Sequence, residues 1–115
     1  MASQCELTQK KCVPCEGGLS PLAADQAKKL LAEVPGWQLA MEGKAIERRF
    51  KFKNFAQALA FVNRAGAIAE AEGHHPDIKL GWGYAEFMLW THAIGGLHEN
   101  DFIMASKING LNNNS

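Results

Sequence analysis

The sequence has few cysteines, no excess charge of either sign and no long apolar run. It has three cysteines, and all of them lie near the N-terminus, at Cys5, Cys12 and Cys15. An odd number confined to one end of the chain argues against a fold built on disulfides. Twelve Lys and Arg balance twelve Asp and Glu, so the net charge gives no attraction to nucleic acid or to an anionic membrane. Residues 1–11 lack the apolar core of a secretory signal, and no apolar run approaches the roughly 20 residues of a membrane span. We therefore expect a soluble, cytoplasmic protein without direct contact to nucleic acid or membrane.

The composition is that of one globular domain. The chain has 115 residues, of which 47% are hydrophobic and 21% charged, far from the composition of disordered chains. Low periodicity sets residues 1–18 apart as a cysteine-containing arm. We expect the folded domain over residues 19–110 and a polar tail over residues 111–115.

Three segments have the pattern of helices. The clearest begins at Asn54, which can cap the helix together with Gln57, and apolar residues then recur every three or four positions from Phe55 to Ala69. Gly73 is the natural stop of this helix. The other two are expected from Ser20-Pro21 to Pro35-Gly36 and from Asn100-Asp101 to Asn109.

Four further segments are predicted to form strands, paired into two hairpins. They are Trp37–Met41, Ala45–Phe52, Ile78–Trp82 and Tyr84–His92. The order of elements is an N-terminal helix followed by a β-β-α-β-β-α core. This order indicates an α+β fold, a two-layer sandwich in which helices cover one face of a four-stranded antiparallel sheet.

Three histidines and a nearby carboxylate form the most informative pattern. His74 and His75 directly precede Pro76, and His92 ends the last predicted strand. Histidine exchanges protons near neutral pH, because its unperturbed pKa is about 6.5. Glu70 lies in the helix turn that leads to the pair, where a carboxylate opposes the helix dipole. The pattern indicates either a proton-transfer site or a metal site.

The histidines belong to a longer set of spaced residues. Three residues separate the first carboxylate, Glu70, from the histidine pair. Five residues then separate Pro76 from Trp82, nine separate Trp82 from His92, and eight separate His92 from Asp101. The members, in order, are Glu70, His74, His75, Pro76, Trp82, His92 and Asp101. This set resembles the signature of the pterin-4a-carbinolamine dehydratases, and the resemblance extends over roughly residues 20–110.

The resemblance implies an enzyme without metal or cofactor that dehydrates 4a-hydroxytetrahydropterin to quinonoid dihydropterin. This reaction regenerates the cofactor of aromatic amino-acid hydroxylases. The resemblance also implies that His74, His75 and His92 are catalytic and that Glu70 and Asp101 support them. We expect His75 and His92 to carry protons and His74 to orient the substrate, each proton transfer contributing about 10²–10⁴-fold.

Three residues are expected to bind the substrate. Pro76 holds His75 in an extended backbone. A flat pterin can stack on Trp82, although a place at the rim of the hairpin core is an equal alternative. Trp90, with Met88, is large for a solvent-facing position on the last strand, so this face is expected to meet a ligand or another subunit.

Zinc is the competing interpretation at two places. Three histidines can hold a catalytic zinc, but adjacent side chains of an extended segment point to opposite sides, which makes joint ligation by His74 and His75 awkward. Cys5, Cys12 and Cys15 offer three of the four ligands that a structural zinc needs. An arm without metal is the alternative for the cysteines.

A second class of function is a dimerisation or regulatory module, or an assembly chaperone, with little enzymatic activity. The resemblance implies it, because members of the family are transcriptional dimerisation cofactors in animals and related bacterial folds are assembly chaperones. The open edges of a four-stranded sheet suit the pairing of two copies. We expect a homodimer or homotetramer that binds a small pterin, with an aromatic amino-acid hydroxylase as a further candidate partner.

Overall fold

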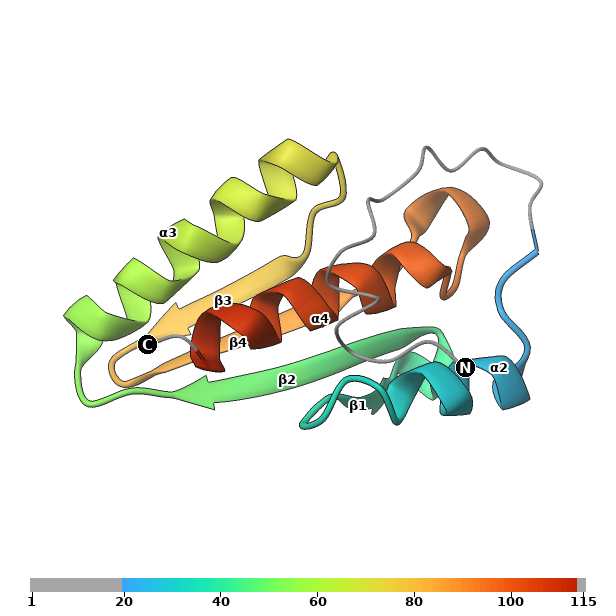
Figure 1. Cartoon of the computed structure of the whole chain (residues 1–115), viewed down its shortest axis with the longest axis horizontal. Coiled ribbons are helices and arrows are strands. Elements are labelled where there is room, and N and C mark those ends of the chain that lie inside the picture. The colour runs from blue at the N-terminus through green and yellow to red at the C-terminus, as the bar shows by residue number, and fades with distance from the viewer. Residues whose placement is uncertain (1–19, 114–115) are drawn as a thin grey trace.

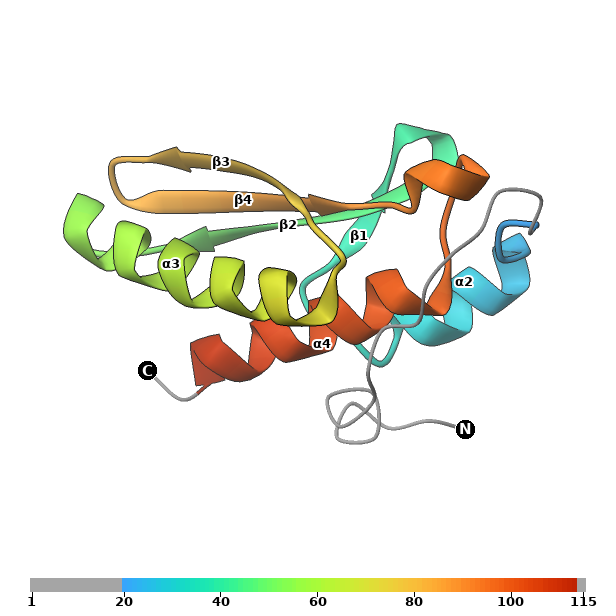
Figure 2. The ribbon, with the colours of Figure 1, turned by 90° about the horizontal axis from the view of Figure 1, so that it is seen from above.

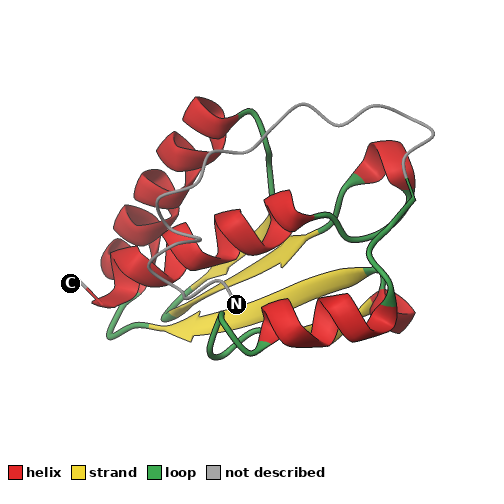
Figure 3. Cartoon of the chain, turned by 45° about the vertical axis from the view of Figure 1, so that its right-hand side comes forward, coloured by secondary structure: helices red, strands yellow, loops and turns green. Residues whose placement is uncertain are grey.

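The structure, a computed structural model, describes residues 20–113, which form a sheet layer and a helix layer (Figure 1). The helices of this part lie together on one face of the sheet (Figure 2, Figure 3). They are α2 (Ala24–Leu31), α3 (Phe55–Glu72) and α4 (Glu99–Asn113). No helix within residues 20–113 is long and apolar enough to cross a membrane.

The sheet of the described chain has four antiparallel strands in the order β1-β2-β4-β3. The strands are β1 (Gln38–Ala40), β2 (Ala45–Lys51), β3 (Asp77–Gly81) and β4 (Tyr84–Leu89). Both predicted hairpins, β1-β2 and β3-β4, are present. Antiparallel pairing of β2 with β4 joins them into one sheet. The predicted two-layer α+β fold is confirmed, and β1 and β3 are the edges of the sheet.

Aromatic side chains fill the space between α3 and the centre of the sheet. The Phe61 ring of α3 lies 4.8 Å from that of Phe50 and 5.8 Å from that of Phe87, between ring centroids. All three are buried, and removal of such a ring typically costs about 3–5 kcal/mol. The predicted apolar stripe of this helix was partly wrong, because Phe55 and Leu59 are 43% and 39% exposed.

The ends of α3 agree with the prediction, whereas the start of α2 does not. Asn54 Oδ1 accepts a hydrogen bond from the Gln57 backbone N–H at 2.9 Å, and Gly73 ends the helix with a left-handed φ of 67°. The helix expected from Ser20-Pro21 begins only at Ala24. The reason is tertiary, since the Leu22 N–H donates to the Leu97 carbonyl at 2.9 Å and so ties this segment to the loop before α4.

Two further predicted boundaries were wrong. The strand expected over Tyr84–His92 ends at Leu89, because Thr91 turns away to pair with Gly96 and His92–Ile94 form a 3₁₀ turn. The last helix extends beyond Asn109 to Asn113, so it includes residues that were expected in a polar tail.

A half-buried arginine fastens α4 to the sheet. Arg48 of β2 donates to the Asn109 side chain at 2.6 Å and to the Pro35 carbonyl at 3.0 Å, while Trp37 Nε1 donates to the same Asn109 oxygen at 2.8 Å. Burial lowers the pKa of Arg48 below its ordinary value. These bonds hold the C-terminal half of α4 in register with β2.

Candidate active site

The end of α3 delivers the histidine pair to the edge of the sheet. Gly73 reverses the backbone and the His74 N–H donates back to the Ala69 carbonyl at 3.2 Å, so the helix stops directly before the pair. Pro76 then favours an extended backbone for His75. The chain enters β3 at the next residue. The pair is therefore held between two regular elements.

His74 belongs to a buried hydrogen-bond network centred on Asp101. Its Nε2 lies 2.6 Å from Asp101 Oδ1, and the side chains are 12% and 0% exposed. The other carboxylate oxygen, Oδ2, accepts from Thr91 Oγ1 and from the His98 backbone N–H, both at 2.9 Å. Because an ionised carboxylate only accepts, the proton of the first bond lies on His74 Nε2. The Nδ1 of a neutral His74 is then unprotonated, and its lone pair can accept a hydrogen bond.

His98 caps the start of α4 and so belongs to the same network. Its ring Nδ1 accepts from the Asn100 backbone N–H at 3.0 Å, and its carbonyl accepts from the Asp101 N–H at 3.0 Å. A ring nitrogen that accepts carries no proton, so neutral His98 has its proton on Nε2. His98 is not a member of the spaced set identified in the sequence.

The other two histidines are exposed to solvent and each has one close partner. His75 Nε2 lies 2.6 Å from Glu70 Oε1, with side chains 58% and 80% exposed. The ring of His92 lies against that of Trp90, with centroids 4.0 Å apart and an angle of 30° between the planes. Both imidazoles are therefore reachable by a small molecule, in contrast to His74.

The network brings together most of the residues that the sequence pattern singled out. Asp101 joins His74 to Thr91, so the segments that carry His75 and His92 converge at one place. Sequence reasoning missed Thr91 as a site residue. The available signal was a polar side chain directly before His92, at a position of the predicted strand that alternates with the solvent-facing Met88 and Trp90.

Trp82 is not part of this convergence within one chain. It lies in the turn between β3 and β4, where it is 72% exposed, and not in a strand as predicted. Five residues of β3 separate it from Pro76, which is about 17 Å of extended chain. The structure of one chain thus leaves the expected stacking residue at the far end of β3.

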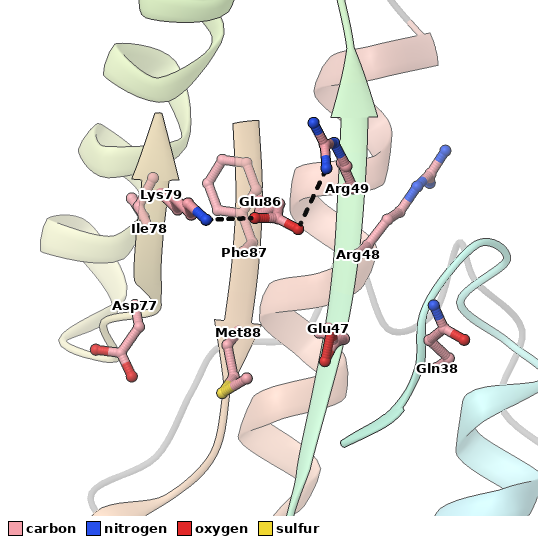
Figure 4. A pocket seen from close by; sticks show the side chains of 10 residues that line it. All are labelled: Gln38, Glu47, Arg48, Arg49, Asp77, Ile78, Lys79, Glu86, Phe87 and Met88. Carbon is pink, nitrogen blue, oxygen red and sulfur yellow. Dashed lines mark ion pairs between the residues drawn. The ribbon is translucent and has the colours of Figure 1, made fainter. Parts of the chain in front are cut away.

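The open face of the sheet carries a hollow of about 430 Å³ that is separate from the histidines. Charged side chains dominate its floor, where Glu86 lies 3.9 Å from both Arg49 and Lys79 (Figure 4). Met88 and Asp77 also line it. Within the described chain no histidine lines the hollow, so the histidine edge and not this hollow has the groups suited to proton transfer near neutral pH.

The described residues 20–113 contain no group of three or more His, Cys, Asp or Glu placed to hold a metal ion. Within this range His74 and His75 have different carboxylate partners, Asp101 and Glu70. The cysteine ligands considered from the sequence, Cys5, Cys12 and Cys15, lie outside the described residues.

Fold and site together define a small α+β protein whose histidines are supported by carboxylates, an arrangement suited to general acid–base chemistry. Comparison with known proteins agrees, because the family model described as pterin 4 alpha carbinolamine dehydratase matches residues 20–111. The chain belongs to this family.

Individual relatives are similar over nearly their whole length. A Halorhodospira halophila protein with the provisional name pterin-4-alpha-carbinolamine dehydratase is 57% identical over 105 residues, which is 91% of this chain and 96% of the relative. A Methylococcus capsulatus protein with the same provisional name is 53% identical over 107 residues, which is 93% of this chain and 94% of the relative.

Two solved structures are similar in fold. A Brucella melitensis protein described as a transcriptional coactivator/pterin dehydratase is 34% identical with a TM-score of 0.76, and the match covers 80% of this chain and 98% of that one. A pterin dehydratase-like protein described as a RuBisCO assembly factor of the alpha-carboxysome is 26% identical with a TM-score of 0.58. That match covers 66% of this chain and 88% of the other.

Proposed function

We propose that the protein dehydrates 4a-hydroxytetrahydropterin to quinonoid dihydropterin by general acid–base catalysis through its histidines. The observation that carries the proposal is the Asp101 network, which draws the segments of His75 and His92 together around a buried His74. Membership of the dehydratase family supplies the substrate class. The reaction needs no electron transfer, because its only small product is water.

The chemistry requires one acid and one base on a single pterin. The C4a–O bond breaks, the acid gives a proton to the departing hydroxyl to form water, and the base removes the proton from the ring N–H. His75 and His92 take these two roles, since both are exposed to a bound molecule. His74, whose proton is held by Asp101, orients the substrate through its remaining ring nitrogen.

The carboxylates and the aromatic residue of the site have supporting roles in this proposal. Glu70 accepts from His75 and so fixes its ring and tautomer, as Asp101 does for His74. Trp90 supports His92 by stacking and offers an apolar wall for the flat pterin. Pro76 limits the backbone freedom of His75. The product, after a separate two-electron reduction to the tetrahydropterin, serves again as the cofactor of an aromatic amino-acid hydroxylase. The working form is a homo-oligomer.

A direct assay tests the proposal. The decay of chemically generated 4a-hydroxytetrahydropterin is followed with and without protein, and we expect a clear acceleration over buffer. His75→Ala and His92→Ala should each reduce the acceleration about 10²–10⁴-fold, whereas Lys51→Ala at an exposed end of β2 should leave it unchanged. No acceleration by the wild-type protein would refute the enzymatic function.

Elemental analysis tests the metal-free mechanism separately. Protein purified without a metal-affinity tag should catalyse the reaction with no stoichiometric zinc, and a chelator should not lower the rate. One zinc ion per chain that is lost together with activity would contradict proton transfer by free imidazoles.

The second candidate function is a dimerisation, regulatory or assembly-chaperone module with little activity. The similarity to the protein described as a RuBisCO assembly factor favours it. The two candidates differ in their dependence on the histidines. A purely structural module should not accelerate the reaction even as the wild-type protein. Its His75→Ala/His92→Ala double variant should keep both the fold and the binding of the partner.

A further inference from the structure

A second hollow, of about 690 Å³, lies where the end of β2, the first turns of α3 and the end of α4 come together (Figure 1, Figure 2). Three cations line it, and they are Lys51, Lys53 and Arg64. The amide side chains of Gln57 and Asn112 line it as well. No Asp or Glu among residues 20–113 does so. The hollow is therefore a local concentration of positive charge.

The acidic residues of the chain lie elsewhere in the sequence. No Asp or Glu occurs between Glu47 and Glu70, a stretch that contains the end of β2 and most of α3, and none follows Asp101. The whole chain has twelve acidic and twelve basic residues, so its net charge does not cause the excess at the hollow. A neutral protein with one such hollow attracts anions to that place and not to its whole surface.

The basic residues of β2 and of the turn after it are of two kinds. Arg48 and Arg49 are used within the fold, the first by hydrogen bonds to the end of α4 and the second by an ion pair on the open face of the sheet. Lys51 and Lys53, like Arg64 of α3, are exposed. None of these three side chains forms an ion pair with another residue of the described chain. Their charges are therefore available to a ligand.

Gln57 adds a hydrogen-bond donor that the backbone orients. Its Oε1 accepts from the Lys53 backbone N–H at 3.2 Å, so the side-chain NH₂ points away from this bond and can donate to a ligand. Gln57 and Arg64 are seven residues apart, which is about two helical turns, so they share one face of α3. An amide donor thus lies beside the cations, an arrangement that suits an anion with several oxygens.

The kind and number of the cations favour phosphate groups. Arginine can bind a phosphate through two parallel N–H donors, and lysine binds it as a point charge. Three cations around one hollow match a ligand with several adjacent negative charges better than a single phosphate. The volume is that of a small-molecule site, for which about 300–1,000 Å³ is usual.

We propose that this hollow binds the polyphosphate group of a small ligand through Lys51, Lys53 and Arg64, with Gln57 as a further donor. Inorganic polyphosphate and a nucleoside triphosphate both have this chemistry. The site is independent of the proposed dehydration. α3 has 18 residues and is about 27 Å long, and the hollow lies along its first three turns, whereas the histidine pair follows its last.

Titration calorimetry of the full chain with sodium triphosphate, without divalent cations, tests the site. We expect saturable binding of one triphosphate per chain that weakens as salt is added, because the cations are exposed and screened. The triple variant Lys51→Ala/Lys53→Ala/Arg64→Ala should raise the dissociation constant at least about tenfold, since it removes the charge-assisted hydrogen bonds.

The matched control is the triple variant Lys28→Ala/Lys29→Ala/Lys44→Ala, which removes the same charge from exposed positions elsewhere. It should bind triphosphate like wild type. No binding by the wild-type protein would overturn the proposal, as would equal losses in the two triple variants, because the net charge alone would then explain the binding.

The choice of anion tests the class of ligand. Triphosphate should bind at least about tenfold more tightly than orthophosphate or citrate. Citrate that binds as tightly as triphosphate would overturn the assignment to phosphate. ATP that binds more tightly than triphosphate would identify a nucleotide as the source of the group, and weaker binding of ATP would identify inorganic polyphosphate.

Two further measurements separate this site from other functions. A single-stranded oligonucleotide that binds tenfold more tightly than triphosphate would overturn the small-ligand proposal, because it would extend the contacts along a phosphate backbone. The dehydration assay should give the same rate for the triple variant at the hollow as for wild type. A slower variant would show that the hollow is not independent of the histidine site.

Discussion

The candidate active site has a buried half, which contains His74 and Asp101, and an exposed half, which contains His75 and Glu70. Each half has a histidine–carboxylate pair, but the two pairs differ in their exposure to solvent. His74 and Asp101 lie 2.6 Å apart with side chains 12% and 0% exposed. His75 and Glu70 lie at the same distance with side chains 58% and 80% exposed. A buried pair has no water to replace a lost partner, whereas an exposed pair exchanges its partner for solvent at little cost.

In the proposed mechanism, the buried half fixes the geometry of the site and the exposed half acts on the substrate. The carboxylate of Asp101 accepts three hydrogen bonds from three segments of the chain, so it holds the end of α3, the loop after β4 and the start of α4 together. The exposed histidines have one close partner each and are free to meet a ligand. Stability should therefore follow the buried half, and turnover should follow both.

The largest expected effect is the loss of Asp101. Asp101→Ala leaves the His74 ring N–H, the Thr91 hydroxyl and the His98 N–H without their acceptor. Because a buried donor without an acceptor costs about 1–3 kcal/mol, we expect the free energy of unfolding to fall by about 3–5 kcal/mol. Urea denaturation measures this change. Asp101→Asn is the matched variant, because it keeps the size of the side chain but replaces one accepting oxygen with an NH₂ group, which then faces other hydrogen-bond donors. An Ala variant as stable as wild type would remove the distinction between the two halves.

The second effect concerns the residue that sequence reasoning missed. Thr91→Val keeps the shape of a 4% exposed side chain but removes one donor to Asp101, at a cost of about 1–3 kcal/mol. Because Asp101 orients His74, we also expect kcat to fall about tenfold with KM little changed. Thr91→Ser keeps the hydroxyl and should retain most of the rate. A Ser variant as slow as Val would mean that packing, not the hydrogen bond, matters.

The sequence pattern named residues that the structure brings together, such as His74 and Asp101, but not all the hydrogen bonds that connect them. Residues of the spaced set, such as Asp101 and the histidine pair, were identified because their intervals do not depend on the exact end of any element. The hydrogen bond from Thr91 to Asp101 could not be predicted in this way, because it depends on where β4 ends. From the sequence alone, Thr91 fits the alternating pattern as one more residue of the strand. Only the pairing of Thr91 with Gly96, a contact between loop positions, ends the strand at Leu89.

The fold shows the same limit at the ends of its helices. The cap at Asn54 is local, since the donor lies three residues away, and it was predicted correctly. The start of α2 is set by the Leu22 bond to Leu97, which is far away in sequence. Local periodicity also does not identify the buried face of α3, because the exposed Phe55 and Leu59 fit a helical period as well as the buried Phe61 does.

A third, smaller effect is expected at the stacked pair of the exposed half. Trp90→Leu removes the ring against which His92 lies at 4.0 Å, and stacking of this kind is worth about 0.5–1.5 kcal/mol. We expect kcat/KM to fall about three- to tenfold, with a smaller loss for Trp90→Phe, which keeps a ring. Steady-state kinetics measures both. Equal rates for Leu and wild type would show that His92 needs no support from Trp90.

The smallest effect on stability, and the sharpest contrast with Asp101, is expected at Glu70. Glu70→Gln removes a carboxylate that is 80% exposed, and an exposed pair of this kind contributes less than about 1 kcal/mol. The urea midpoint should therefore stay within error of wild type, and it should rise slightly if anything, because the charge opposes the dipole at the end of α3. Turnover should nevertheless fall several-fold, since the amide of Gln accepts more weakly than a carboxylate and can also donate to the ring, so it no longer fixes the tautomer of His75. Unchanged turnover would place Glu70 outside the catalytic machinery, and a loss of stability comparable to that of Asp101→Ala would show that exposure does not separate the two halves of the site.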